Sequence, residues 1–150
     1  MIAIDLSEFH QHLKLKTEDG RQLLFDPVRK NYFVVQPEEL VRQSWVHLIN
    51  KKFEVPFSNL SVERQIKVSG LNKRFDLVLY QKGQAHVLFE FKSFNYKINQ
   101  NTCMQVANYN FELMVPYIVI SNGIEHFAYL VNFHEKSIKA LDNLSFLKPT

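Results

Sequence analysis

The 150-residue chain has little cysteine and little glycine, and each shortage excludes a class of site. One cysteine, Cys103, rules out an internal disulfide and any zinc site of several thiolates, fits a reducing cytosol and is expected to pack as a small apolar residue. The four glycines stand too far apart for a G-x-x-x-x-G-K or G-x-G-x-x-G loop, which excludes nucleotide-binding motors. G-x-S-x-G and H-E-x-x-H are also missing, so serine hydrolysis and zinc-peptidase chemistry lack their motifs.

Long apolar runs and a secretion signal are missing as well. No run approaches the roughly 18 residues of a membrane span, and the N-terminal stretch carries Asp5 and Glu8 where a signal peptide is basic. We therefore expect a cytoplasmic protein with no membrane association. The net charge of +3 is compatible with a polyanionic partner but does not identify one.

Length and hydrophobic periodicity predict one α/β domain, with residues 1–24 as a lead-in and hairpin and residues 25–133 as the core. The turn signal Glu18-Asp19-Gly20 predicts the hairpin, while the first 16 residues and the tail to Thr150 are weakly patterned. A helix is expected from Pro37 to about Asn50 and another from about Thr102 to Met114. Because the second helix permits a parallel crossover, we expect a mixed sheet flanked by helices. Strands are expected at residues 23–25, 32–35, 62–68, 74–80, 87–92, 116–121 and 126–133.

Three charges interrupt the apolar strands of a central hairpin that turns at Gln81-Lys82-Gly83-Gln84. Period two places Glu90 and Lys92 on one face, and closure of the hairpin brings Asp76 onto a neighbouring strand, in a register that the sequence leaves open. Magnesium suits oxygen ligands from Asp76 and Glu90, and the carbonyl of Phe91 could complete the set of ligands that the protein supplies. Lys92 could orient or deprotonate a water or offset phosphate charge. A solvated ion pair on an edge strand explains the same pattern without any function.

The two predicted helices supply further candidates. The first has a packing stripe with Glu38 near its middle and Glu39 toward its edge, and a first-turn glutamate stabilised by the helix dipole is an equally good reading. The second is expected to pack through Cys103, Ala107, Phe111 and Met114. It also carries Gln105 and Tyr109 at i and i+4, which either border the site or form a half-exposed amphipathic pair.

Seven segments between Phe25 and Phe133 carry a resemblance to a known family: FDPVRKNYF, PEELVRQ, VERQI, KRFDLVLY, VLFEFK, QVANYN and SNGIEHF. In order and spacing they resemble the N-terminal nuclease domain of the type I restriction enzyme R subunit, which belongs to the PD-(D/E)XK nuclease superfamily. The resemblance implies a restriction-endonuclease-like fold. It also implies that this chain is expected to lack the helicase-like motor of the restriction subunit. Restriction-system or helicase-like subunits are therefore candidate partners, and the resemblance is also compatible with an oligomer of this chain.

Residue by residue, the resemblance implies that Asp76 and Glu90 bind the metal and that Lys92 is the catalytic lysine. Gln105 and Tyr109 match a Q-x-x-x-Y element that lies beside the phosphate in the related exonuclease branch. The helical glutamate of the superfamily falls at Glu38, with Glu39 as the fallback. Glu63 matches an acidic position of no assigned role, and Phe75 replaces the proline of the first motif.

The resulting hypothesis is a magnesium-dependent nuclease that hydrolyses DNA phosphodiester bonds in restriction or repair, with manganese able to substitute. One alternative is a nucleic-acid-binding or assembly module that keeps the nuclease fold with little turnover. A second alternative treats the three charges as a buried ion-pair network. Cleavage assays with magnesium or manganese separate the first two, and the effect of magnesium on thermal stability tests the third.

Overall fold

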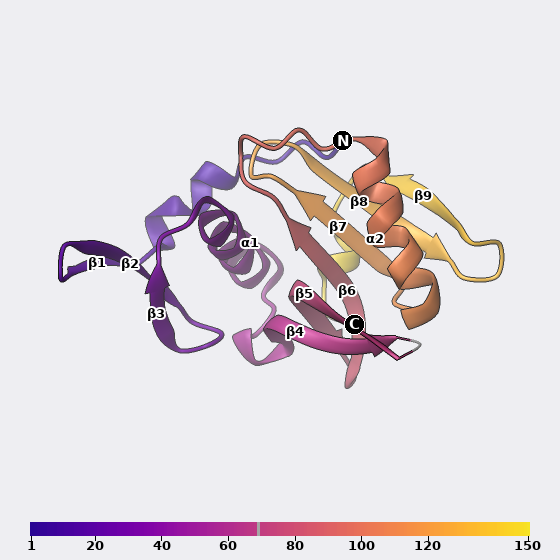
Figure 1. The fold of residues 1–150 in the computed structure, drawn as a ribbon, viewed down its shortest axis with the longest axis horizontal. Helices are drawn as coiled ribbons and strands as arrows, with labels where there is room; N and C mark the ends of the chain where they lie inside the picture. Colours follow the sequence, from indigo (N-terminus) through magenta and orange to yellow (C-terminus); the bar gives the residue numbers. More distant parts are fainter. Residues whose placement is uncertain (69) are drawn as a thin grey trace.

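The structure, a computed structural model, describes residues 1–68 and 70–150 and has the predicted mixed α/β architecture (Figure 1). A small antiparallel sheet has the order β1-β2-β3, and a six-stranded mixed sheet has the order β4-β5-β6-β7-β8-β9. The small sheet comprises β1 (Leu15–Glu18), β2 (Arg21–Asp26) and β3 (Asn31–Val34). The large sheet comprises β4 (Leu60–Val68), β5 (Leu71–Gln81), β6 (Gln84–Phe91), β7 (Tyr117–Ser121), β8 (His126–Asn132) and β9 (Ser137–Leu141). The helices are α1 (Pro37–Phe53) and α2 (Gln100–Leu113), with short 3₁₀ helices η1 (Leu6–His12), η2 (Phe57–Asn59) and η3 (Ser145–Leu147).

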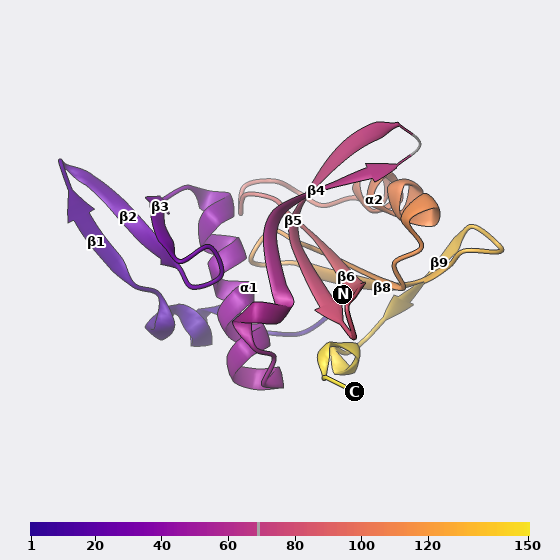
Figure 2. The same cartoon turned by 90° about the horizontal axis from the view of Figure 1, so that it is seen from below.

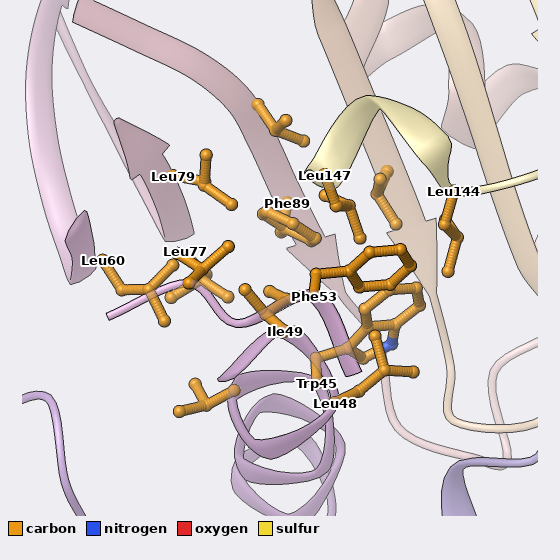
Figure 3. Packing of buried hydrophobic residues seen from close by; sticks show 14 of the residues in the cluster. Trp45, Leu48, Ile49, Phe53, Leu60, Leu77, Leu79, Phe89, Leu144 and Leu147 are labelled. Atoms are coloured by element: carbon orange, nitrogen blue, oxygen red, sulfur yellow. The ribbon is translucent and has the colours of Figure 1, made fainter. Parts of the chain in front are cut away.

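Helix α1 lies between the two sheets (Figures 1 and 2). Proline at the first helical position is compatible with the helix start, because the N–H that proline lacks has no intrahelical partner there. The helix ends at Glu54, whose φ of 58° is left-handed. All residues from Val41 to Ile49 are buried, because structure covers the helix on more than one side. Figure 3 shows Trp45 and Ile49 pointing toward Leu77 and Phe89 of the large sheet.

Helix α2 covers the opposite face of the large sheet. Side chains on β6 alternate between the two layers: Phe89 packs in the cluster that contains Trp45, whereas Leu88 packs in the cluster that contains Ala107 of α2. The helix begins after Asn99, whose side chain accepts a hydrogen bond from the Thr102 N–H at 3.0 Å. It connects β6 to β7, which pair in parallel, so the predicted crossover is confirmed.

Both predicted hairpins are present. β1 and β2 pair across Asp19-Gly20, and β5 and β6 pair across Lys82-Gly83. Lys82 and Gly83 have φ values of 51° and 76°, the sign that a two-residue type I′ hairpin turn requires at both central positions. None of the helices in the described part of the chain is both long and apolar enough to cross a membrane.

Four details differ from the sequence-based expectations. The lead-in contains the 3₁₀ helix η1, and the weakly patterned tail forms β9 and η3. Met114, expected on the packing face of α2, is 59% exposed because it caps the helix with a left-handed φ of 58° and so leaves the helical repeat. Glu38, expected on the inward face of α1, is exposed, and Glu39 is buried instead, because the segment after β2 covers the Glu39 side of the helix through Arg29.

Candidate active site

Three acidic residues lie in a row across β4, β5 and β6. The β5–β6 pairing ends at Leu77↔Phe89, and one further step in that register brings Asp76 opposite Glu90. On the other side of β5, the pairs that flank Glu63 place it opposite Asp76 in the same way. Directly opposed residues on neighbouring strands have Cβ atoms about 5 Å apart, and like charges there are destabilising. The row therefore concentrates negative charge at one place on the sheet.

Asp76 is held at the end of the β5–β6 ladder by the backbone of β6. Its Oδ2 accepts a hydrogen bond from the Phe91 N–H at 2.6 Å, where a β5 carbonyl would otherwise be the partner. Because the N–H and C=O of one residue in an extended strand face the same edge, the Phe91 carbonyl also faces β5. The predicted metal ligands Asp76, Glu90 and Phe91 thus come together at the point where β5 and β6 part.

Lys92 lies beside this row, on the same side of the strand as Glu90. Its Nζ is 3.9 Å from Glu90 Oε1, and its backbone N–H donates to the Ser121 carbonyl at 2.9 Å, which extends the β6–β7 pairing. The prediction that Glu90 and Lys92 share a face is confirmed. Lys92 Nζ also lies 5.2 Å from the centre of the Tyr96 ring.

Burial makes the carboxylates costly to ionise. It raises the pKa of Glu90 to about 7, and the nearby Asp76 charge adds to the effect. Burial also raises the pKa of Asp76, against the opposing effects of the Phe91 N–H and of the Arg42, Lys92 and Lys73 charges. Glu90 Oε2 is buried and has no hydrogen-bond partner among the described residues. An unpaired carboxylate oxygen beside a second carboxylate is what a bound cation would satisfy.

The donor set fits a hard divalent cation that keeps several waters. Within the residues that the structure describes, no group of three or more His, Cys, Asp and Glu side chains is arranged to hold a metal. Two carboxylates and one carbonyl are nevertheless a sufficient share for magnesium, which is usually bound through one or two carboxylates and completes its shell with water and phosphate oxygens. Zinc and other metals that prefer nitrogen or sulfur ligands do not fit Asp76, Glu90 and Phe91.

Two arginines join the acidic row to α1 and to the small sheet. Arg42 Nη2 lies 3.6 Å from Glu63 Oε1 and 3.7 Å from Asp76 Oδ1, and Arg42 Nη1 also donates to Glu39 Oε2. Arg29 donates to Glu39 Oε1 and, at 2.6 Å, to Asp26 Oδ2. Neither arginine was among the site residues predicted from the sequence. A signal was present in the i, i+3 spacing of Asp26 with Arg29 and of Glu39 with Arg42.

The two glutamates at the start of α1 therefore have different surroundings. Glu39 is 7% exposed and paired with the two arginines, and burial raises its pKa. Glu38 is exposed, yet its negative charge contributes to the raised pKa of Glu90, so it lies within electrostatic range of the acidic row. Glu39 thus faces the arginines, whereas Glu38 is exposed in the first turn of α1.

A cleft of about 450 Å³ opens onto Glu90 and Lys92 between α2 and the outer part of the large sheet. Gln105 and Tyr109 line its α2 side, so the structure brings this predicted pair together with the two central charges. Lys73 of β5 lines the other side, with its Nζ 5.0 Å from the centre of the Tyr109 ring. Lys73 was not among the site residues predicted from the sequence, and its only signal there is its place three positions before Asp76.

Comparison with known families identifies the family of the chain. Residues 37–144 match the family described as type I restriction enzyme R protein N terminus. The chain belongs to this family. The match begins at the first residue of α1 and takes in both helices and β4 to β9, so the small sheet lies before it. No curated protein gives a significant match. Membership of a restriction-enzyme family indicates a restriction-related, nuclease-like function.

Proposed function

We propose that the protein is a magnesium-dependent nuclease that hydrolyses DNA phosphodiester bonds, a member of the PD-(D/E)XK superfamily acting in a restriction system. The observation that carries the proposal is the pair of adjacent, partly buried carboxylates, Asp76 and Glu90, with a lysine 3.9 Å from one of them at an open cleft. Two carboxylates this close together lower the stability of the folded protein unless a cation binds between them.

Asp76, Glu90 and the Phe91 carbonyl would hold the metal, which would supply positive charge to the scissile phosphate and lower the pKa of a bound water. The Phe91 N–H fixes Oδ2 of Asp76, and Oδ1 lies 3.7 Å from Arg42 Nη2, so a bound metal would share this carboxylate with the arginine. Glu90 contributes the buried oxygen that has no other partner among the described residues. Manganese, which accepts the same oxygen ligands, is expected to substitute.

Lys92 would act on the phosphate or on the attacking water. Its ammonium is held near Glu90 and Tyr96, and its side chain is 30% exposed, which leaves it accessible from the cleft. A positive charge at this place offsets the charge that develops on the phosphorane oxygens. Gln105 and Tyr109 on the facing wall are in position to contact the same phosphate or its neighbour.

The test is a cleavage assay on supercoiled and linear DNA with magnesium or manganese. We expect cleavage by the wild type and a loss of about 100-fold or more in the Asp76→Ala and Lys92→Ala variants. Glu135→Gln, which removes an exposed acid from the β8–β9 turn, is the matched control and should cleave normally. Absence of wild-type cleavage with either metal, or unchanged cleavage in both site variants, would refute the proposal and favour a binding or assembly module.

A further inference from the structure

The outer halves of β4 and β5 form a two-stranded arm that extends beyond the rest of the large sheet. Residues 64–68 pair with residues 71–75, but β6 pairs with β5 only from Leu77 onward. In both orientations the arm reaches toward α2 (Figures 1 and 2). We refer to residues 64–68 and 71–75 as the β4–β5 arm.

One face of the arm packs on α2 and thereby becomes a wall of the cleft. Ile66 and Phe75 belong to the same apolar cluster as Val106 and Ala107 of α2. An isolated two-stranded ribbon is only marginally stable, so this packing is what holds the arm in place. Lys73, which pairs with Ile66 in the register, is on this face and extends into the cleft.

The arm is basic, although the acidic row is adjacent to it. Residues 64–75 contain four cations and no acid. Opposed residues share a face, so Arg74 and Lys67 lie on the outer face with Gln65 and Asn72, and both cations are exposed. Arg64 is exposed as well, at the base of the arm. Lys73 therefore presents positive charge to the cleft, while Lys67 and Arg74 present it to solvent on the other face of the arm.

Protection of a sheet edge does not account for all of this charge. Lysines on an edge strand prevent pairing with another chain, and β4 is an edge strand. In the arm, residues 71–75 of β5 are also unpaired on their β6 side, but Lys73 is partly buried against Tyr109 rather than directed to solvent. A phosphate-binding role accounts for the cations on both strands.

We propose that the β4–β5 arm holds the backbone of the DNA substrate, with Lys73 contacting a phosphate beside Glu90 and with Arg64, Lys67 and Arg74 contacting flanking phosphates. The inference rests on the proposed function, since it names the surface that presents the substrate to that site. Contacts of this kind are insensitive to base sequence and strongly dependent on salt, because each neutralised phosphate releases condensed counterions.

The test measures DNA binding separately from cleavage. Fluorescence anisotropy with a labelled 20-base-pair duplex, in EDTA to prevent metal-dependent cleavage, gives the dissociation constant between 0.05 and 0.5 M salt. The variant is Lys67→Gln/Lys73→Gln/Arg74→Gln. The charge-matched control replaces three exposed lysines elsewhere, Lys136→Gln/Lys139→Gln/Lys148→Gln. Circular dichroism and thermal melting establish that both variants are folded, and the single variant Arg74→Gln on the outer face repeats the measurement if the triple variant is not.

We expect the arm variant to bind about 100-fold more weakly at about 0.1 M salt, with a salt slope smaller by about two to three, and the control to bind as the wild type does. For Arg74→Gln alone the slope should fall by about one. Arm variants that keep wild-type affinity and slope, or a control that loses as much as the arm variant, would overturn the inference. So would arm variants that bind normally but self-associate, because the cations would then serve only to protect the edge. If the wild-type protein binds DNA through the arm but never cleaves it, the proposed nuclease function is refuted, while the inference that the arm binds DNA is supported.

Discussion

Replacing Glu90 with glutamine should stabilise the metal-free protein at alkaline pH. Glu90 holds its proton more tightly in the folded protein, where its pKa is about 7, than in the unfolded chain, where it is 4.5. Between these values the folded state carries more protons than the unfolded state, so the free energy of unfolding falls as pH rises through this window. Glutamine cannot ionise and removes this loss.

The magnitude follows from the two pKa values. At 1.36 kcal/mol per pKa unit, ionised Glu90 lowers the free energy of unfolding by about 3 kcal/mol at pH 8, but by less than about 1 kcal/mol at pH 5. The side chain is 15% exposed, so solvent screening removes only a small part. The new amide leaves a buried N–H unpaired, at a cost of about 1 kcal/mol at both pH values. We therefore expect a net gain of about 2 kcal/mol at pH 8 and none at pH 5.

Urea denaturation of wild type and Glu90→Gln, at pH 5 and pH 8 in EDTA, measures the difference. His47 and His126 contribute the opposite pH dependence, because burial lowers their pKa values to about 4, but they contribute equally in both proteins and cancel. Glu135→Gln, at an exposed position, should change little at either pH. A gain for Glu90→Gln that is the same at pH 5 and pH 8, or no gain at either, would show that Glu90 is ionised without cost and would refute the reasoning.

Three further outcomes are expected. Magnesium at 100 times its dissociation constant should raise the free energy of unfolding by about 2.7 kcal/mol in the wild type, but not in Asp76→Asn; an equal rise in both would exclude this site. Arg42→Met should lower it by about 3 kcal/mol in urea denaturation, because Glu39 and Asp76 lose a shared cation; a loss within 0.5 kcal/mol would show that the network is dispensable. Cys103, 3% exposed and with a pKa raised by burial, should react with a thiol reagent only after denaturation; fast reaction of the native protein would contradict its placement.

The sequence predicted most of the fold because local signals agreed with the tertiary arrangement. Pro37 and the acids after it marked the start of α1 to the residue, and Lys82-Gly83 marked the turn between β5 and β6. β9 was missed because its burial pattern, with three of five residues exposed, does not alternate. Its strand character depends on pairing with β8 rather than on the pattern of its own residues.

The three charges of the central hairpin were predictable, whereas the arginines around them had only a weak signal in the sequence. Asp76, Glu90 and Lys92 stood out because charge is rare inside apolar strands. Arg29 and Arg42 looked like ordinary polar positions on a turn and a helix. Their roles depend on α1 being covered on both sides, which turns an expected half-exposed helix into a buried one and leaves Arg42 only 6% exposed. The helical periodicity of a sequence does not reveal burial that other parts of the fold cause.

The feature that assembles the acidic row is a one-residue irregularity in the β5–β6 hairpin. At the turn, Gln81 pairs with Gln84 and Tyr80 with Ala85, and continuing that register would place Asp76 opposite Phe89. The pairing shifts between Leu79 and Tyr80, so that the next pair is Leu79↔Val87, with one additional residue on β6. A slip of one residue exchanges the two faces of a strand, because side chains alternate with period two. Without the bulge, Asp76 would lie opposite Phe89, whose side chain is buried. With the bulge, Asp76 lies opposite Glu90. The two-residue turn alone therefore predicts the wrong partner for Asp76, and the site exists because the bulge corrects the register by one.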